Sequence, residues 1–201
     1  MKTIKIWNDS PSERQLDEIA SLLNEGQVMI WPTDTLYGIA CDALNVKAID
    51  RICRLKGLNP EKTHLSIVAS DIAQAAEYAK FDNKVFRLLK VNTPGPFTFL
   101  CRAASSLPRA FKGRKTVGVR IPDCLTARSI AERLGRPILT TSIEYDDEDF
   151  AIDPGLIAEK YSDRVDFFVE GEEGKTTPST TVDCTTDDFT IVREGLGELE
   201  L

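Results

Sequence analysis

The sequence contains one histidine, His64, and none of the residue spacings that mark several large enzyme classes. It has no GxxxxGK[ST] and no GxGxxG pattern, so both the P-loop and the dinucleotide-binding fingerprint are missing. It also has no HExxH pattern, which argues against a zinc peptidase. A single imidazole without a recognisable nucleophile partner is more typical of a structural residue than of a catalytic dyad.

Paired cysteines are missing as well. The five cysteines lie far apart in the sequence, and no two of them have CxxC spacing. This distribution indicates neither a zinc site nor a disulfide framework. We expect reduced, mostly buried thiols in a cytoplasmic protein, at Cys41, Cys53, Cys101, Cys124 and Cys184.

Long apolar runs are also absent. No segment approaches the roughly 20 consecutive apolar residues that a membrane helix needs. The first ten residues, MKTIKIWNDS, lack the apolar centre of a secretory signal. We therefore expect no membrane partner.

The chain lacks an excess of positive charge: acidic residues outnumber basic ones, and the formal net charge is −7. This value argues against a generally basic nucleic-acid-binding protein but leaves a local basic groove open. The most basic short segment is AFKGRKT, residues 110–116, and it has two interpretations, an exposed turn or an RNA contact. An RNA-binding groove would take its cations from Arg102, Arg109, Lys112, Arg114 and Lys115.

The sequence does contain an alternation of short apolar strands and amphipathic helices. The periodicity predicts strands at 3–7, 27–31, 65–69, 97–102, 116–122, 137–142, 165–171, 180–184 and 189–194. It predicts helices at 11–25, 45–56, 71–79, 83–91, 126–135 and 154–161. Strand–helix alternation followed by hairpin-like strands favours an α/β fold with a mixed, twisted sheet. Since no repeat or linker is visible, we expect a single domain over residues 1–201.

Three local patterns give more specific expectations. Ser10 to Glu13 is expected to be a capping box with Pro11 at the first helical position. Phe86 is expected to face inward with the other apolar residues of helix 83–91. Residues 144–153 include six acids and no base, which indicates an exposed, solvated loop. The alternative for this segment is a carboxylate cluster that holds Mg²⁺.

Hydroxyl and cationic side chains gather at the ends of the predicted strands and of one helix. Thr116 and Arg120 share one face of their strand because an even number of residues separates them. The others are Thr33, Thr35, Lys56, Thr140, Thr141, Ser142, Ser179, Thr180 and Arg193. Such a set suits an anionic small ligand, a phosphate or a carboxylate. The alternative is that the hydroxyls cap turns and the cations are surface charges.

The stretch WPTDTLYGIACDALN, from Trp31 to Asn45, leaves a buried strand through polar residues. We expect Thr35 to contact substrate and Asp34 to hold the turn. Gly38 is expected to supply a backbone shape that a side chain would obstruct. For Tyr37, packing against substrate and packing in the core are both open.

Several ordered segments resemble the YrdC-like family: PTDTLYGIACDA, RLKG, PGPFTF, TVGVRIPD, TTS, PSTTVD and IVREG. The resemblance is collinear over about residues 13–195. It implies an α/β fold with a twisted open mixed sheet, flanking helices and a concave, basic cavity. Family members that are threonylcarbamoyl-AMP synthases join L-threonine, bicarbonate and ATP, and release pyrophosphate. The product serves threonylcarbamoyladenosine formation in tRNA, and a double-stranded RNA-binding role has also been attributed to the family.

The resemblance also implies roles for individual residues. The residues that fall on the threonine side are Thr35, Tyr37, Arg120, Ser142 and Ser179. Those on the nucleotide side are Lys56, Thr116 and Arg193, and the catalytic pair is Lys56 and Ser142. ATP would enter as a substrate with Mg²⁺, without an organic cofactor and without a metal site of the protein.

Two positions depart from the family's synthases, which have Lys-x-Arg after the first long helix and Ser-x-Asn after the TS strand. Leu58 replaces the arginine and Glu144 replaces the asparagine. Two like charges about 5 Å apart at an effective dielectric of ~20 repel by roughly 3 kcal/mol, so Glu144 would oppose an anionic substrate. RICRLKGL, VFRLLKVNTPGPFTF and TVGVRIP resemble the YciO-type branch, which shares both departures.

Three hypotheses follow from the sequence. The first is an enzyme of the threonylcarbamoyl-AMP synthase type with weak or altered activity. The second is a protein without this catalysis that binds double-stranded RNA or tRNA. The third is a regulator that binds a nucleotide or an amino acid.

Overall fold

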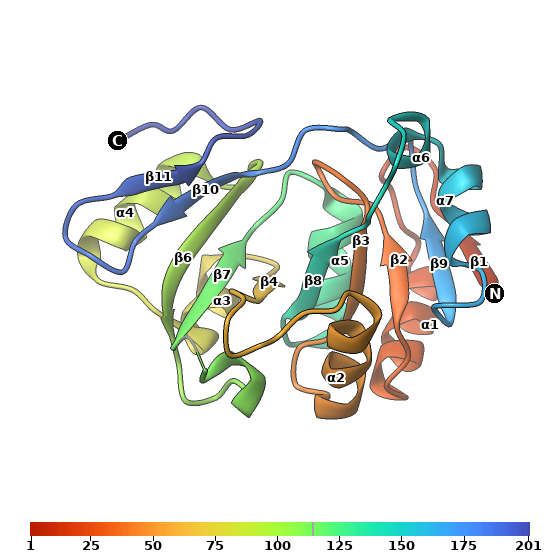
Figure 1. The fold of residues 1–201 in the computed structure, drawn as a ribbon, viewed down its shortest axis with the longest axis horizontal. Coiled ribbons are helices and arrows are strands. Elements are labelled where there is room, and N and C mark those ends of the chain that lie inside the picture. Colours follow the sequence, from red (N-terminus) through yellow and green to blue (C-terminus); the bar gives the residue numbers. More distant parts are fainter. Residues whose placement is uncertain (114) are drawn as a thin grey trace.

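The computed structural model describes residues 1–113 and 115–201. Within these residues, eleven strands form a single sheet (Figure 1). The strands are β1 Lys2–Lys5, β2 Met29–Trp31, β3 Gly38–Asp42, β4 Ser66–Val68, β5 Ala79–Lys80, β6 Phe97–Ala103, β7 Thr116–Arg120, β8 Ile138–Ser142, β9 Phe167–Glu170, β10 Thr180–Asp183 and β11 Thr190–Arg193. The α-helices are α1 Glu13–Asn24, α2 Val46–Leu55, α3 Ile72–Tyr78, α4 Asn83–Asn92, α5 Leu125–Leu134, α6 Asp149–Ile152 and α7 Pro154–Tyr161.

The sheet is mixed, as the sequence predicted. Its order is β1-β9-β2-β3-β8-β4-β7-β6-β10-β11, with β5 paired to β6 outside this path. Parallel pairs, such as β4 with β7 and β6 with β10, lie among antiparallel ones, such as β3 with β8 and β6 with β7. Figure 1 shows the strands fanning across the molecule, so the sheet is strongly twisted and open. The predicted α/β class is confirmed.

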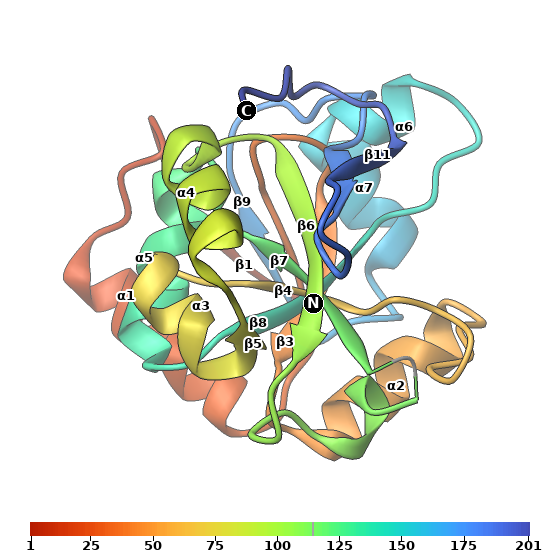
Figure 2. The ribbon, with the colours of Figure 1, turned by 90° about the vertical axis from the view of Figure 1, so that its left-hand side faces the viewer.

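Two apolar layers cover the sheet. One packs α1 and α5 against its first face and includes Leu23, Ile130 and Phe167. The other includes residues of α2, α3, α4 and α7. Neighbouring residues of a strand enter different layers: Phe167 belongs to the first and Phe168 to the second, because successive side chains of a strand point to opposite faces. Figure 2 shows helices on both sides of the twisted sheet.

Strand β3 was missed by the sequence prediction. All five of its residues are buried, so the segment lacks the alternation that marks a half-exposed strand. Gly38 begins the strand where space is tight: a Cβ there would lie 2.6 Å from Thr140 Oγ1 and 3.0 Å from Trp31 Nε1. Trp31 Nε1 donates to that Thr140 hydroxyl, at 3.1 Å. A side chain at Gly38 would therefore obstruct the packing, as expected, but through close contact with its neighbours.

Three local predictions need correction. The helix cap is Ser12, whose hydroxyl accepts from Gln15 N while the Gln15 side chain accepts from Ser12 N; Pro11 lies before the helix. Phe86 is 47% exposed, because it lies off the stripe of α4 that contacts the core. The acidic segment 144–153 is not all loop, since Asp149–Ile152 forms α6 and Ala151 is fully buried.

The thiols agree with the expectation from composition. All five cysteines are unpaired and buried. In the part of the chain that the structure describes, the helices are too short or too polar to cross a bilayer.

Helix α5 receives its cap from a residue far away in the sequence. Asp9 accepts from the backbone N–H groups of Leu125 and Thr126, at 2.5 and 2.7 Å. Asp9 has a φ of 48°, in the left-handed region that aspartate and asparagine tolerate better than most residues. The chain before α1 is thereby fixed to the start of α5.

We predict that Asp9→Ala lowers the free energy of unfolding by about 2 kcal/mol, because it removes a helix cap and places alanine at a positive φ. Asp9→Asn keeps an acceptor and tolerates this φ, so it should cost less than about 1 kcal/mol. Urea denaturation of the two variants checks the difference. Equal losses would show that Asp9 does not act as a cap.

Candidate functional site

A cavity of about 470 Å³ lies against the strands from β8 to β11 in sheet order. Its lining combines hydroxyl groups, two arginines and a few apolar side chains. The polar lining residues are Thr63, His64, Ser66, Thr98, Arg120, Thr140, Thr141, Ser142, Ser179, Thr181, Asp183 and Arg193; the apolar ones are Leu58, Leu65, Leu100 and Val192. The sheet thus gathers side chains from strands that are distant in the sequence.

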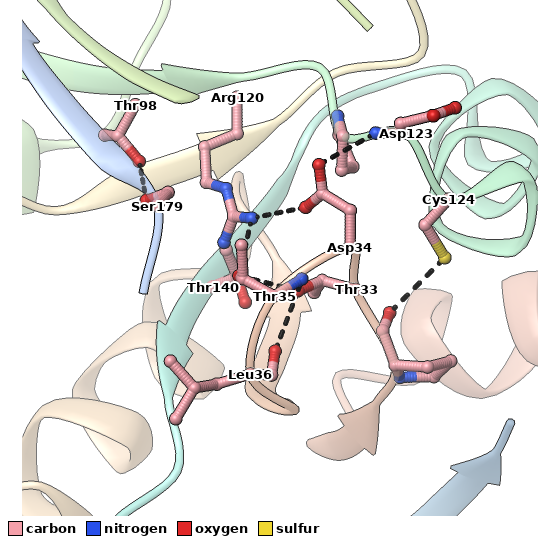
Figure 3. A network of polar contacts seen from close by, with 12 residues as sticks. Thr33, Asp34, Thr35, Leu36, Thr98, Arg120, Asp123, Cys124, Thr140 and Ser179 are labelled. Carbon is pink, nitrogen blue, oxygen red and sulfur yellow. Dashed lines mark hydrogen bonds and ion pairs between the residues drawn. The ribbon is translucent and has the colours of Figure 1, made fainter. Parts of the chain in front are cut away.

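Arg120, at the end of β7, is the central cation of this cavity. It is 7% exposed, and its Nη2 donates to Asp34 Oδ1 at 2.8 Å and to Thr35 Oγ1 at 3.0 Å (Figure 3). Asp34 Oδ2 also accepts from the backbone N–H of Asp123, at 2.9 Å. Burial lowers the pKa of the Arg120 guanidinium, and the charge of Asp34 opposes that shift. The Nε of Arg120 is buried and has no hydrogen-bond partner among the described residues.

The turn after β2 is held by Thr33. Its hydroxyl donates to the carbonyl of Leu36 at 2.7 Å and accepts from Thr35 N at 3.1 Å. Asp34, which the sequence assigned to this turn, instead binds Arg120. The turn therefore presents Asp34 and Thr35 to the strand end at β7.

Ser179 and Arg193 form a second polar cluster of the cavity, and the charge of Arg193 is near enough to lower the pKa of Arg120 further. The Ser179 hydroxyl lies 2.8 Å from Thr98 Oγ1, and Arg193 Nη2 donates to Ser179 O at 2.9 Å and to Ser179 Oγ at 3.2 Å. Burial lowers the pKa of Arg193. Among the described residues Arg193 forms no ion pair, so no carboxylate of the chain balances its charge there.

Thr116 and His64 make a direct contact, with 2.7 Å between His64 Nδ1 and Thr116 Oγ1. His64 lines the cavity, whereas Thr116 does not. His64, which the sequence indicated as structural, therefore lines the cavity, and Thr116 lies behind it.

Lys56 and Glu144 form an ion pair next to the cavity, with 2.8 Å between Lys56 Nζ and Glu144 Oε1. Leu58, two residues after Lys56, and Ser142, two residues before Glu144, both line the cavity. The hydrogen bond and charge of Lys56 lower the pKa of Glu144. Glu144 therefore neutralises a cation of the chain, which the sequence did not reveal.

Tyr37 lies apart from this cavity. Its ring is buried against Phe168, and its hydroxyl donates to the carbonyl of Glu172 at 2.8 Å and accepts from Gly171 N at 3.0 Å. Burial raises the pKa of this phenol. Both hydrogen bonds of the Tyr37 hydroxyl go to the backbone and fix the segment after β9; a substrate contact of this residue stays a prediction.

Two further hypotheses from the sequence concern charged segments: RNA binding by residues 110–116 and Mg²⁺ binding by residues 144–153. In the basic segment, Arg109–Phe111 forms one 3₁₀ turn with Phe111 buried; Lys112 and Lys115 are exposed, and Arg114 lies outside the described residues. Within the described parts of the chain, no three His, Cys, Asp or Glu residues are grouped as metal ligands, including those of 144–153.

Taken together, the cavity is suited to a small anion with polar groups. A buried guanidinium and several hydroxyls can hold a carboxylate, and Arg193 provides a second positive charge in the same cavity. Of the candidate residues, Arg120, Ser142, Ser179 and Arg193 line the cavity directly. Thr35 lies one hydrogen bond behind Arg120, and Lys56 pairs with Glu144 beside the cavity without lining it.

Residues 21–195 match the model of the Sua5/YciO/YrdC family, which is described as "Telomere recombination". The chain belongs to this family. It is 33% identical over 198 residues to the uncharacterized protein YciO of Escherichia coli K12, covering 97% of this chain and 96% of YciO. The crystal structure of E. coli YciO has a TM-score of 0.90 and covers 98% of both chains at 32% identity.

Other members of the Sua5/YciO/YrdC family carry functional names. A threonylcarbamoyl-AMP synthase of Bacillus subtilis is 28% identical over 190 residues, which are 92% of this chain but 55% of the synthase. The structure of P. abyssi Sua5 complexed with L-threonine has a TM-score of 0.87 at 26% identity and covers 97% of this chain and 58% of Sua5. These matches confirm the predicted resemblance, including the YciO-type branch.

Sequence reasoning missed several lining residues of this family domain, notably Ser66, Thr98, Thr181 and Asp183. Thr98 had a usable signal, since a polar residue inside the apolar strand FTFLC is unusual and indicates a special environment. Ser66 faces Gly118, where a Cβ would lie 2.4 Å from Ser66 Oγ. That close approach depends on the pairing of β4 with β7, which the sequence does not specify.

We predict that Asp34→Ala is strongly destabilising, by about 3–5 kcal/mol, because it leaves the buried Arg120 guanidinium without its counter-charge. Asp17→Ala is the matched control, since Asp17 pairs with Arg133 at the surface and should cost at most about 1 kcal/mol. Chemical denaturation measures both losses. Similar small losses would mean that the buried pair contributes little.

We also predict that Lys56→Met raises the pKa of Glu144 toward the ordinary value of about 4.3. The wild-type pKa is lower, so the pair stabilises the fold at neutral pH and is lost as the pH falls through the folded-state pKa. NMR titration of the side-chain carboxyl carbons checks this shift. Lys160→Met is the control: Lys160 pairs with Asp146 at 3.3 Å and lowers the Glu144 pKa less than Lys56 does, so this variant should raise that pKa less than Lys56→Met. An unchanged Glu144 pKa in Lys56→Met would contradict the ion pair.

Proposed function

We propose that this chain is an enzyme of the threonylcarbamoyl-AMP synthase type, which joins L-threonine, bicarbonate and ATP and releases pyrophosphate. The observation that supports this proposal most strongly is Arg120: a buried guanidinium, fixed by Asp34 and Thr35, that lines a hydroxyl-rich cavity and has an unsatisfied Nε. A buried donor without a partner is costly and is satisfied when a ligand supplies an acceptor. The named relatives, a synthase and a threonine complex, agree with this ligand class.

In this proposal, the amino acid binds at the Arg120 end. Its carboxylate accepts from Arg120, whose orientation Asp34 and Thr35 fix before the ligand arrives. Ser142 and Ser179 provide hydroxyls at the same cavity for the remaining polar groups of threonine. Preorganised donors of this kind cost little rearrangement when they bind an anion.

The nucleotide lies toward Arg193 and Lys56. The amine of threonine forms a carbamate with bicarbonate, and one water leaves. An oxygen of this carbamate then attacks the α-phosphorus of ATP, the bond from that phosphorus to the bridging oxygen breaks, and pyrophosphate leaves. Two anions must approach each other, so cations near the reacting groups reduce the repulsion. Arg193 can act directly because no carboxylate of the described residues neutralises it, and Lys56 and Ser142 are the proposed catalytic contacts.

Mg²⁺ would arrive with ATP, held by the phosphates, since the described residues offer no three-ligand cluster of their own. It supplies charge neutralisation on the pyrophosphate. The product is proposed to serve tRNA modification in the cytoplasm, a location that the five unpaired, buried cysteines favour.

Arg193→Gln should lower pyrophosphate release from ATP by at least about tenfold, because it removes a guanidinium donor from the nucleotide end. The assay follows pyrophosphate with and without L-threonine and bicarbonate. Arg102→Gln is the matched control: within the described residues Arg102 donates only to the Thr185 carbonyl, at 3.4 Å, and it is not part of the cavity lining.

Two results would contradict the enzyme. One is pyrophosphate release that does not depend on threonine and bicarbonate. The other is no release at all together with RNA binding that falls steeply with salt and is weakened by Arg102→Gln, which is the outcome expected of a nucleic-acid-binding protein.

A further inference from the structure

The Lys56–Glu144 ion pair is unequal in its exposure. The Lys56 side chain is 10% exposed and that of Glu144 is 67% exposed. The lysine is thus enclosed by the protein, and the carboxylate covers its charged end from the solvent side. A ligand phosphate that approaches Lys56 therefore meets Glu144 as well.

Two elements fix the partners of this pair. Lys56 caps the end of α2, with its N–H bonded to the carbonyl of Ile52. On the other side, the hydroxyl of Tyr161 in α7 accepts from Glu144 N at 2.9 Å and donates to Glu144 O at 3.3 Å. Tyr161 is buried, so the backbone of Glu144 is held by a fixed group even though its carboxylate is exposed.

The cavity lining also includes apolar side chains, which lie among hydroxyl-bearing residues such as Thr141 and Ser142. Leu58, which follows Lys56 by two residues, lines the cavity and packs against the core cluster. Leu65, Leu100 and Val192 add further apolar lining. Apolar side chains offer no hydrogen bonds to phosphate oxygens, so the charge state of Lys56 decides how this part of the cavity receives a polyphosphate.

We propose that Glu144 determines ligand selectivity in this cavity: by neutralising Lys56 beside the apolar wall of Leu58, it weakens polyphosphate binding and leaves carboxylate binding at Arg120 unaffected. The inference rests on the proposed function for the identity of the carboxylate, L-threonine. A polyphosphate must either displace Glu144 from Lys56, which leaves that carboxylate uncompensated, or bind without the free charge of Lys56. Because Glu144 is exposed, solvent screens part of its charge. Removing that charge should therefore increase the affinity for a polyphosphate by about tenfold.

The test measures binding of inorganic tripolyphosphate, of MgATP and of L-threonine separately, by isothermal titration. Tripolyphosphate isolates the charge effect from contacts of the adenosine. Glu144→Gln keeps the size of the side chain and removes its charge. The matched control is Asp146→Asn, which makes the same charge change two residues later. Asp146 pairs with Lys160, at 3.3 Å, and not with Lys56.

Glu144→Gln is expected to bind tripolyphosphate and MgATP about tenfold more tightly than the wild type, with the threonine affinity within twofold. Asp146→Asn should match the wild type for all three. A second variant, Leu58→Arg, adds a guanidinium at the apolar wall and should also tighten tripolyphosphate binding.

The inference is overturned if Glu144→Gln binds tripolyphosphate within twofold of the wild type. It is equally overturned if Asp146→Asn tightens binding as much, since the effect would then be one of overall charge, or if no variant binds tripolyphosphate. Absence of threonine binding in every variant would instead contradict the proposed function, and the tripolyphosphate results would still decide the role of Glu144.

Discussion

The buried ion pair between Asp34 and Arg120 is the interaction on which the cavity depends. The two residues are 86 positions apart, and their contact joins the turn after β2 to the end of β7. Burying a guanidinium costs several kcal/mol unless a charge and hydrogen bonds compensate it, and here Asp34 and Thr35 provide both on one side only. Arg120 also lines a cavity rich in hydroxyls, and its buried Nε has no hydrogen-bond partner among the described residues. The fold thus holds a cation at a fixed place with unused hydrogen-bonding capacity, which is what recognition of a small carboxylate requires.

The second ion pair, Lys56 with Glu144, has the opposite character. Arg120 is oriented by its partner from behind, whereas Glu144 covers Lys56 from the solvent side. The electrostatic consequence differs accordingly: Arg120 stays directed into the cavity, whereas Lys56 is neutralised beside it. Glu144 was expected from the sequence to repel an anionic substrate, and the geometry gives a more specific account, since its nearest charge is the lysine itself. Leu58 and Glu144 are the two positions at which the sequence departs from the pattern of the family's synthases, and both lie at or beside the cavity.

Much of the fold was predictable because strand and helix periodicities are local. The helices, the mixed sheet and the family resemblance were all indicated by the sequence, whereas β3 was not, because both of its faces are buried and no alternation appears. At the site, Arg120, Ser142, Ser179 and Arg193 were found from their places at strand ends, and the structure brings them to one cavity. The partners of Asp34, Glu144 and Asp9 could not be found in this way, since each contact joins segments that only the tertiary fold brings together. Tyr37 shows the converse: a tyrosine in a functional motif can be committed entirely to backbone hydrogen bonds.

The central claim is that one cavity receives an amino-acid carboxylate at Arg120 and a nucleotide toward Arg193 at the same time. Isothermal titration of L-threonine in the absence and in the presence of saturating ATP, with bicarbonate left out so that no product forms, tests this claim most directly. The account predicts that threonine binds and that its affinity changes with ATP, by the same factor as the affinity for ATP changes with threonine. Threonine affinity that is independent of ATP, or binding of neither ligand, would contradict it.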